Sequence, residues 1–140
     1  AIISGLSFEN NLNSLLSFYI AGITGLGYGL RQIIDAQSTH GIKTNSIVIR
    51  GGAGNSPLVR QLLADSTGIP VATPGSEEPI LLGSAMLGAV SSGIFSSIHE
   101  SMQKMSQLGK VLTPVTGNLA TLHQKRYSKF KLLQIASKET

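Results

Sequence analysis

The segment best suited to chemistry in this sequence is the glycine-rich stretch at residues 51–55, Gly-Gly-Ala-Gly-Asn. It follows Ile47-Val48-Ile49, an apolar run typical of a strand buried on both faces and therefore of a parallel sheet. Ser56 and Pro57 come next and predict the cap and the first residue of a helix. Because glycines let the backbone approach a ligand and a helix N-terminus attracts an anion, this unit fits a nucleotide. The alternative is a tight turn that binds nothing.

Two common phosphate-binding motifs are absent from this stretch. No Gly-Lys-Ser or Gly-Lys-Thr follows the glycines, so it is not a Walker A loop. Pro57 stands where a dinucleotide-binding fingerprint requires its third glycine. The stretch alone therefore identifies no nucleotide-binding family.

Side chains suited to catalysis are otherwise scattered. His40, His99 and His123 lie in separate segments without metal-ligand spacing, which predicts surface or packing roles and no metal site. Asp35 and Asp65 fall within predicted helices, where exposed carboxylates are expected. No serine occupies a nucleophile elbow, and the absence of cysteine excludes thiolate chemistry and is compatible with a reducing cytosol. We therefore expect no catalytic residue in this chain.

A long amphipathic helix is predicted upstream of the glycine-rich stretch. Apolar residues recur at steps of three and four over residues 11–37, and Gly41 is the expected stop. Each glycine inside a helix costs about 1 kcal/mol relative to alanine, so we expect close approach of another backbone to compensate. The glycines concerned are Gly22, Gly25, Gly27 and Gly29. This helix is therefore predicted to be central to the fold.

Helices and extended segments alternate downstream. Helices are expected at residues 57–67, 81–90, 97–105 and 118–137, a strand at 69–72 and an extended link through Pro114. The small residues of the second helix suit packing on a sheet or on another helix. The last helix is expected to have one basic face and one apolar face, the latter made of Leu119, Leu122, Tyr127, Phe130 and Leu133.

Composition indicates one compact domain within a longer protein. A length of 140 residues suits a single domain, and 41% hydrophobic against 13% charged residues excludes a disordered chain. So little charge is unusual for an independent domain and is expected where other parts of a polypeptide cover the surface. The beginning at Ala1 likewise looks like a cut through a longer chain.

Charge and hydropathy argue against two classes of partner. Much of the net charge of +4 lies near the C-terminus, where we interpret it as a solvated helix face. No aromatic-interleaved basic patch indicates nucleic-acid binding. Uncharged windows at residues 10–30 and 79–98 approach the length of a membrane span, but polar residues interrupt both. We expect neither a nucleic-acid nor a membrane partner.

Residues 51–61, Gly-Gly-Ala-Gly-Asn-Ser-Pro-Leu-Val-Arg-Gln, resemble the adenosine-binding motif Gly-Gly-Gly-Ala-Arg-Ser-Pro-Leu-Trp-Arg-Gln of the FGGY carbohydrate kinases. Ala64-Asp65, residues 68–71 (Gly-Ile-Pro-Val) and residues 82–90 follow in the family's order. Upstream, residues 25–31 resemble the helix that precedes the motif. The resemblance thus covers nearly the whole chain.

The C-terminal region is similar to the tail of ribulose-type pentulose kinases. The matching segments are residues 97–102, Met105-Ser106, residues 109–111 and residues 127–130. This similarity favours the pentulose-kinase branch of the family.

The resemblance implies an α/β fold, namely part of an actin-like, ribonuclease-H-related ATPase domain with a short mixed sheet flanked by helices. Residues 1–140 are then the C-terminal portion of the second, nucleotide-binding domain. The sugar is held mainly by the N-terminal domain, which this chain lacks. The family's catalytic aspartate matches no residue here, so this chain alone is expected to be inactive.

ATP and Mg²⁺ are the cofactors that the resemblance implies. Gly51, Gly52 and Ala53 are expected to contact adenosine and the α-phosphate through their backbone. Asn55 and Ser56 are expected to contact the base or the edge of the ribose. The full-length protein is then a cytoplasmic kinase that transfers the γ-phosphate of ATP to a hydroxyl of a pentulose such as ribulose, and a homodimer is compatible with this function.

Other functions remain open at the level of the sequence. Within the family, xylulose, gluconate and glycerol are alternative substrates. Outside it, a non-enzymatic actin-like nucleotide switch shares the loop and the layered fold, and a basic interaction module built on the terminal helix is a second rival.

Overall fold

The computed structural model describes residues 2–6, 9 and 11–137. The helices are α1 (Leu12–Thr39), α2 (Gly52–Asn55), α3 (Pro57–Thr67), α4 (Pro79–Ser91), α5 (Ile98–Met105) and α6 (Asn118–Ala136), and the strands are β1 (Ile47–Val48), β2 (Val71–Pro74) and β3 (Leu108–Leu112). All the predicted helices and both predicted strands are present. The helix α2 and the strand β3 were not predicted.

The described strands form one mixed sheet in the order β1-β2-β3. β1 runs parallel to β2, with Ile47 opposite Val71, and β3 runs antiparallel to β2, with Leu112 opposite Val71. This confirms the expected α/β fold with a short mixed sheet flanked by helices. The expectation that the first strand is buried on both faces is wrong here, because β1 is an edge strand and its Val48 is 52% exposed.

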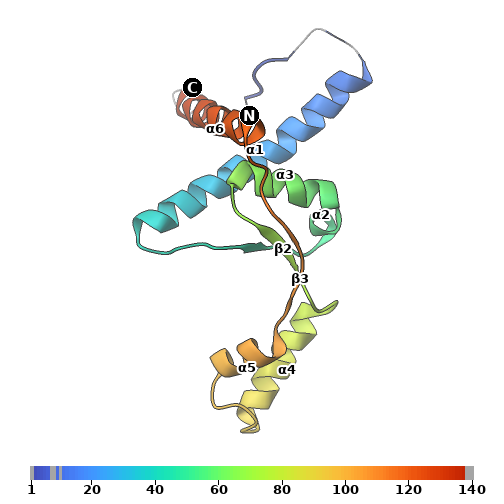
Figure 1. Ribbon diagram of the computed structural model, residues 1–140, viewed down its shortest axis with the longest axis vertical. Helices are drawn as coiled ribbons and strands as arrows, with labels where there is room; N and C mark the ends of the chain where they lie inside the picture. Colours follow the sequence, from blue (N-terminus) through green and yellow to red (C-terminus); the bar gives the residue numbers. More distant parts are fainter. Residues whose placement is uncertain (1, 7–8, 10, 138–140) are drawn as a thin grey trace.

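The helices gather at the two ends of the ribbon formed by β2 and β3 (Figure 1). At one end α1 lies across α3 and α6 lies close by, while at the other end α4 packs on α5. The core lies where α3 meets β2, since Ala64, Val71 and Ala72 have no exposed surface. Helix α4 therefore packs on another helix, which is one of the two arrangements that its small residues predicted.

Of the four glycines of α1, only Gly27 lies in close contact with another element, as was expected for all four. A Cβ atom added at Gly27 would lie 1.9 Å from the Ser66 side-chain oxygen, because α1 and α3 touch at this point. Added Cβ atoms at Gly22, Gly25 and Gly29 would meet no heavy atom within 4 Å. Close packing thus compensates for one helical glycine, and the prediction is wrong for the other three among the described residues.

Aromatic and polar side chains fasten α6 to α1. The Tyr28 hydroxyl oxygen and the His123 Nδ1 atom form a hydrogen bond 2.9 Å long, and the Tyr127 hydroxyl donates to Asp35 Oδ2 at 2.7 Å. The Arg31 guanidinium lies 4.3 Å from the centre of the Tyr127 ring, a cation–π contact. Burial and the bond to Asp35 raise the pKa of Tyr127 to about 12, so its hydroxyl stays protonated as a donor. Helix α6 is therefore held by specific side-chain geometry as well as by apolar burial.

This contact corrects two expectations for the terminal region. Leu119 and Leu122 of the predicted apolar face are 55% and 38% exposed, whereas Tyr127 of the same set is buried and Phe130 and Leu133 are half-buried. His123, which was not assigned to this face, is buried as well, and the packing role expected for it agrees with this position. Asp65 is not an exposed helical carboxylate, because its Oδ1 accepts the Val115 backbone N–H at 2.8 Å.

The strand β3 was not predicted because its sequence, Leu-Gly-Lys-Val-Leu, does not alternate apolar and polar residues. In the structure its buried and exposed residues do not alternate regularly either. Its pairing depends on two glycines that allow close backbone approach. A Cβ atom at Gly109 would lie 2.6 Å from the Thr73 side-chain oxygen, and one at Gly75 would lie 2.8 Å from the Gln107 carbonyl oxygen. These contacts join residues far apart in the sequence, so local pattern could not reveal them.

We expect the stability of the protein to fall on acidification because of His123. Burial, together with the charges of Arg126 and Arg31, lowers the pKa of His123 below its usual 6.5, against an opposing effect of Asp65. A histidine whose pKa is depressed in the folded state contributes stability above the unfolded pKa and loses it as the pH falls toward the folded pKa. The melting temperature should therefore drop between about pH 7.5 and about pH 5.

The matched variant is His123→Gln, whose side chain can accept the Tyr28 hydrogen bond but does not titrate. Its melting temperature should fall less over the same pH interval than that of the unsubstituted protein. An identical fall in both proteins would show that His123 does not contribute to the acid sensitivity.

Candidate nucleotide-binding site

The glycine-rich stretch is more regular than a loop. Residues 52–55 form the one-turn helix α2, in which the Asn55 N–H donates to the Gly51 carbonyl oxygen at 3.2 Å. Gly51 precedes this turn with φ of 99° and ψ of −178°, a conformation that only glycine adopts readily. Gly51 therefore makes the sharp change of direction between β1 and α2.

Helix α3 begins and ends as its sequence predicted. Ser56 is the N-cap, its side-chain oxygen accepts the Val59 N–H at 3.4 Å, and Pro57 is the first helical residue. Gly68 ends the helix with φ of 73°. The first turn of α3 therefore directs its N-terminal N–H groups toward the end of α2, where a partial positive charge favours an anion.

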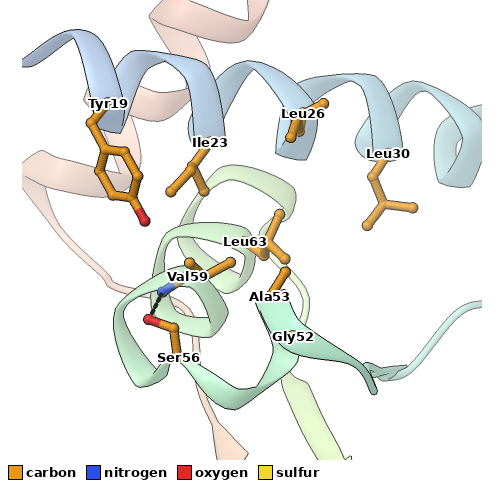
Figure 2. A pocket seen from close by; sticks show the side chains of 9 residues that line it. All are labelled: Tyr19, Ile23, Leu26, Leu30, Gly52, Ala53, Ser56, Val59 and Leu63. Carbon is orange, nitrogen blue, oxygen red and sulfur yellow. Dashed lines mark hydrogen bonds between the residues drawn. The ribbon is translucent and has the colours of Figure 1, made fainter.

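An apolar groove of about 480 Å³ lies between α1 and the turn from α2 to α3 (Figure 2). The residues that line it are Tyr19, Ile23, Leu26, Leu30, Gly52, Ala53, Ser56, Val59 and Leu63. Its size is within the range of small-molecule pockets, which are mostly apolar with a few polar groups that orient the ligand. Three of the five residues expected at the nucleotide, Gly52, Ala53 and Ser56, thus share one wall.

Gly51 and Asn55 do not line this groove. Gly51 lies at the turn before the groove, and Asn55 is the last residue of α2. The fourth residue of the stretch, Gly54, is buried, and a Cβ atom there would lie 3.3 Å from the Ile49 backbone. Within residues 51–55, Gly51 therefore allows the sharp turn and Gly54 allows close packing on Ile49, whereas Gly52 and Ala53 line the groove.

Gly52 leaves space that nothing in the described chain fills. Its φ is not positive, so its backbone does not require glycine, and an added Cβ atom would meet no heavy atom within 4 Å. The absent side chain keeps the groove open beside Ala53 and Ser56. Neither the backbone conformation nor the packing of the described residues therefore requires glycine at position 52.

The opposite wall was not foreseen. Tyr19, Ile23, Leu26 and Leu30 of α1 line this wall. Figure 2 shows the side chains of Tyr19, Ile23 and Leu30 extending toward α2 and α3. Tyr19 and Leu26 are 51% and 74% exposed. Their helical spacing is visible in the sequence, but the same spacing indicates a buried core face.

A link between chain segments supports the base of the site. The Arg50 guanidinium donates a hydrogen bond to the Glu77 carbonyl oxygen, joining the end of β1 to the connection between β2 and α4. Because Arg50 directly precedes Gly51, this bond restrains the start of the glycine-rich turn.

No group of three or more histidine, aspartate or glutamate side chains that could hold a metal ion occurs among residues 2–6, 9 and 11–137. Over these same residues, no helix has both the length and the apolar character needed to cross a membrane.

Comparisons with known proteins agree on one family. The model of the FGGY family of carbohydrate kinases, C-terminal domain, matches residues 1–92, which is more than half of the chain. This chain belongs to the FGGY family. An FGGY carbohydrate kinase domain-containing protein of Xenopus laevis is 36% identical over 138 residues, covering 99% of this chain and 25% of the relative.

Two further relatives extend this result. A D-ribulokinase of Saccharomyces cerevisiae is 34% identical over 112 residues, covering 76% of this chain and 16% of that protein. The solved structure of a kinase from Brucella ovis, described as a xyloylose kinase, superposes with a TM-score of 0.81 at 20% identity, covering 97% of this chain and 27% of that one. This structural likeness shows the fold. The chain spans about a quarter of the length of the curated FGGY carbohydrate kinase domain-containing proteins that it matches.

The residues that match the FGGY family model include the glycine-rich turn, α3 and the whole of α4. The remaining elements, α5, β3 and α6, lie beyond residue 92 but within the alignment to the Xenopus laevis relative. The whole described chain is thus covered by similarity to FGGY proteins.

Proposed function

We propose that this chain is the adenosine-binding C-terminal portion of the second domain of an ATP-dependent sugar kinase. The observation that carries the proposal is the groove whose one wall combines Gly52, Ala53 and the helix cap Ser56. The apolar face of α1 forms the other wall and suits the flat faces of a purine. Membership of the FGGY family supplies the reaction class.

The proposed contacts follow from the position of each residue. Gly52 and Ala53 approach the adenosine along the floor of the groove, and Gly51 orients the turn and approaches the α-phosphate. The Ser56 hydroxyl accepts the Val59 N–H, so its own hydrogen is free to be donated to the base or ribose. Asn55, which does not line the groove, reaches only the edge of the ribose.

Magnesium does not fit the described part of this chain as a protein-bound ion, because no group of metal-ligating side chains gathers there. The proposal therefore assigns the ligands of Mg²⁺ to the ATP phosphates and to the rest of the polypeptide. The sugar and the catalytic base are assigned to that remaining part as well.

A pentulose such as ribulose is the proposed acceptor of the γ-phosphate, in a cytoplasmic enzyme. The similarity to the D-ribulokinase of Saccharomyces cerevisiae supports this choice over xylulose, gluconate or glycerol. In this proposal the kinase aligns a sugar hydroxyl with the γ-phosphate, and the chain described here contributes by holding the nucleotide in place.

We expect the isolated 140-residue chain to show no sugar phosphorylation, and the full-length protein to phosphorylate a pentulose with consumption of ATP. The measurement is a coupled assay of ADP release with a panel of pentuloses, hexuloses and polyols. Turnover by the isolated chain would contradict the assignment of the base elsewhere. Inactivity of the intact protein with the whole panel would contradict the kinase assignment.

A further inference from the structure

Arg60 is an unusual residue of α3 because it is both charged and buried. Its side chain is only 7% exposed, although arginine is among the residues least often buried without a partner. Its Nε atom is the only buried side-chain nitrogen or oxygen among the described residues that has no hydrogen-bond partner. The position therefore leaves a cationic group incompletely satisfied.

The guanidinium group of arginine carries a permanent positive charge in proteins. Removing a charge from water without an anion is strongly unfavourable, and breaking a buried ion pair is among the most damaging changes in a protein. A buried arginine is therefore expected to have an anion as its partner.

Three of the described carboxylates accept hydrogen bonds from residues other than Arg60. Asp65, one turn further along α3, accepts from Gln61 Nε2 and from the Val115 N–H, each at 2.8 Å. Asp35 accepts the Tyr127 hydroxyl, and Glu100 accepts the Ser96 hydroxyl at 2.6 Å. None of these hydrogen bonds involves Arg60.

We propose that Arg60 forms an ion pair with an aspartate or glutamate of the polypeptide outside these 140 residues. The inference rests on the proposed longer polypeptide and not on the nucleotide site. The chain spans a quarter of the length of its curated relatives, so most of the protein is available to supply this carboxylate. The planar guanidinium, which can bind a carboxylate through two parallel hydrogen bonds, suits this partner.

A phosphate of the nucleotide is the competing anion. Arg60 does not line the groove, although Ser56, four residues earlier on the same helix, does. The geometry therefore favours a carboxylate packed against α3 over a ligand held in the groove. The pair would join α3 to a second segment and fix the position of the nucleotide-binding turn relative to the rest of the kinase.

The test uses the full-length protein with Arg60→Met, which keeps most of the side-chain volume and removes the charge. Its melting temperature at about pH 7.5 should fall by about 5 °C or more, since an unpaired carboxylate remains buried. At about pH 4.5 the carboxylate becomes protonated, and the deficit should shrink to less than half. Arg126→Met, on an exposed side chain, is the matched control and should change the melting temperature by less than about 1 °C.

Three results would overturn the proposal. An unchanged or higher melting temperature means that no buried carboxylate faces Arg60. A deficit that is equal at both pH values indicates apolar packing instead of an ion pair. A tenfold loss of ATP affinity without a pH-dependent deficit assigns Arg60 to a phosphate.

Arg60→Lys keeps the test decisive if the methionine variant does not fold. Lysine retains the charge and loses the two-pronged geometry, so its deficit should be clearly smaller than that of Arg60→Gln, which has no charge. Equal deficits in these two variants would contradict the ion pair. Glu139→Gln, which removes a carboxylate outside the described residues, should leave the melting temperature unchanged, whereas a loss equal to that of Arg60→Met would place the partner within this chain.

Discussion

Replacing Gly52 with valine is expected to weaken ATP binding by the full-length kinase more than tenfold while sparing its affinity for the sugar. The valine side chain would enter the groove between Ala53 and the face of α1, where the adenosine is proposed to lie. A tenfold loss of ATP affinity corresponds to only about 1.4 kcal/mol of binding free energy. Displacing the base from the groove is expected to cost more than this. Isothermal titration of ATP and of sugar, performed separately, measures both affinities.

The local structure at Gly52 can accommodate a larger side chain. Because Gly52 has no positive φ and an added Cβ atom meets no atom within 4 Å, the variant should fold with an unchanged melting temperature. Gly22→Val is the matched control, since Gly22 is also helical, equally unhindered and outside the groove. Normal ATP affinity in a folded Gly52→Val protein would leave the glycine-rich turn without a ligand-binding role.

Features set by neighbouring residues were predictable from the sequence. Ser56, Pro57 and Gly68 delimit α3 as expected, and Ser97 caps α5 by accepting the Glu100 N–H at 3.2 Å. Each of these signals acts over one helical turn, so the sequence contains all of its parts. Boundaries of this kind are therefore readable without knowledge of the tertiary structure.

Features set by distant contacts were not predictable. The strand β3 exists because Gly109 lies against Thr73, and α6 docks through Tyr127 because Asp35 and Arg31 meet it from α1. Hydrophobic spacing placed Leu119 and Leu122 on the buried face of α6, but the structure exposes both and buries His123 beside the predicted Tyr127. Specific polar and aromatic contacts here prevail over the apolar pattern.

The candidate site likewise contains one part that was predictable from neighbouring residues and one part that depends on distant contacts. Gly52, Ala53 and Ser56 were found because the motif that carries them is continuous in sequence, and they share one wall of the groove. The wall formed by α1 was missed because its apolar stripe is broader than the surface that α3 covers. Periodicity reports that such a face is apolar, but only the structure distinguishes its buried part from its open part.

Introducing a methyl group at Gly27 is expected to destabilise the protein, although alanine is the better helix former. The added Cβ atom would lie 1.9 Å from Ser66 Oγ and 2.9 Å from Ser66 Cβ. Ser66 has no exposed surface, and its hydroxyl donates to the Leu62 carbonyl oxygen at 2.6 Å, so it cannot move aside freely. Overpacking of this kind costs about 1 to 3 kcal/mol and should exceed the helix gain of about 1 kcal/mol.

Gly25→Ala is the matched control, because Gly25 lies two residues away in α1 and an added Cβ atom there is unhindered. Denaturant unfolding should show Gly25→Ala as neutral or more stable by up to about 1 kcal/mol, and Gly27→Ala as less stable than the unsubstituted protein. Adding Ser66→Gly to Gly27→Ala should recover part of the loss, since the two sites are in contact and their effects are not additive. If Gly27→Ala matched Gly25→Ala and Ser66→Gly gave no recovery, α1 and α3 would not pack at this point, and the wall that α1 contributes to the groove would be misplaced as well.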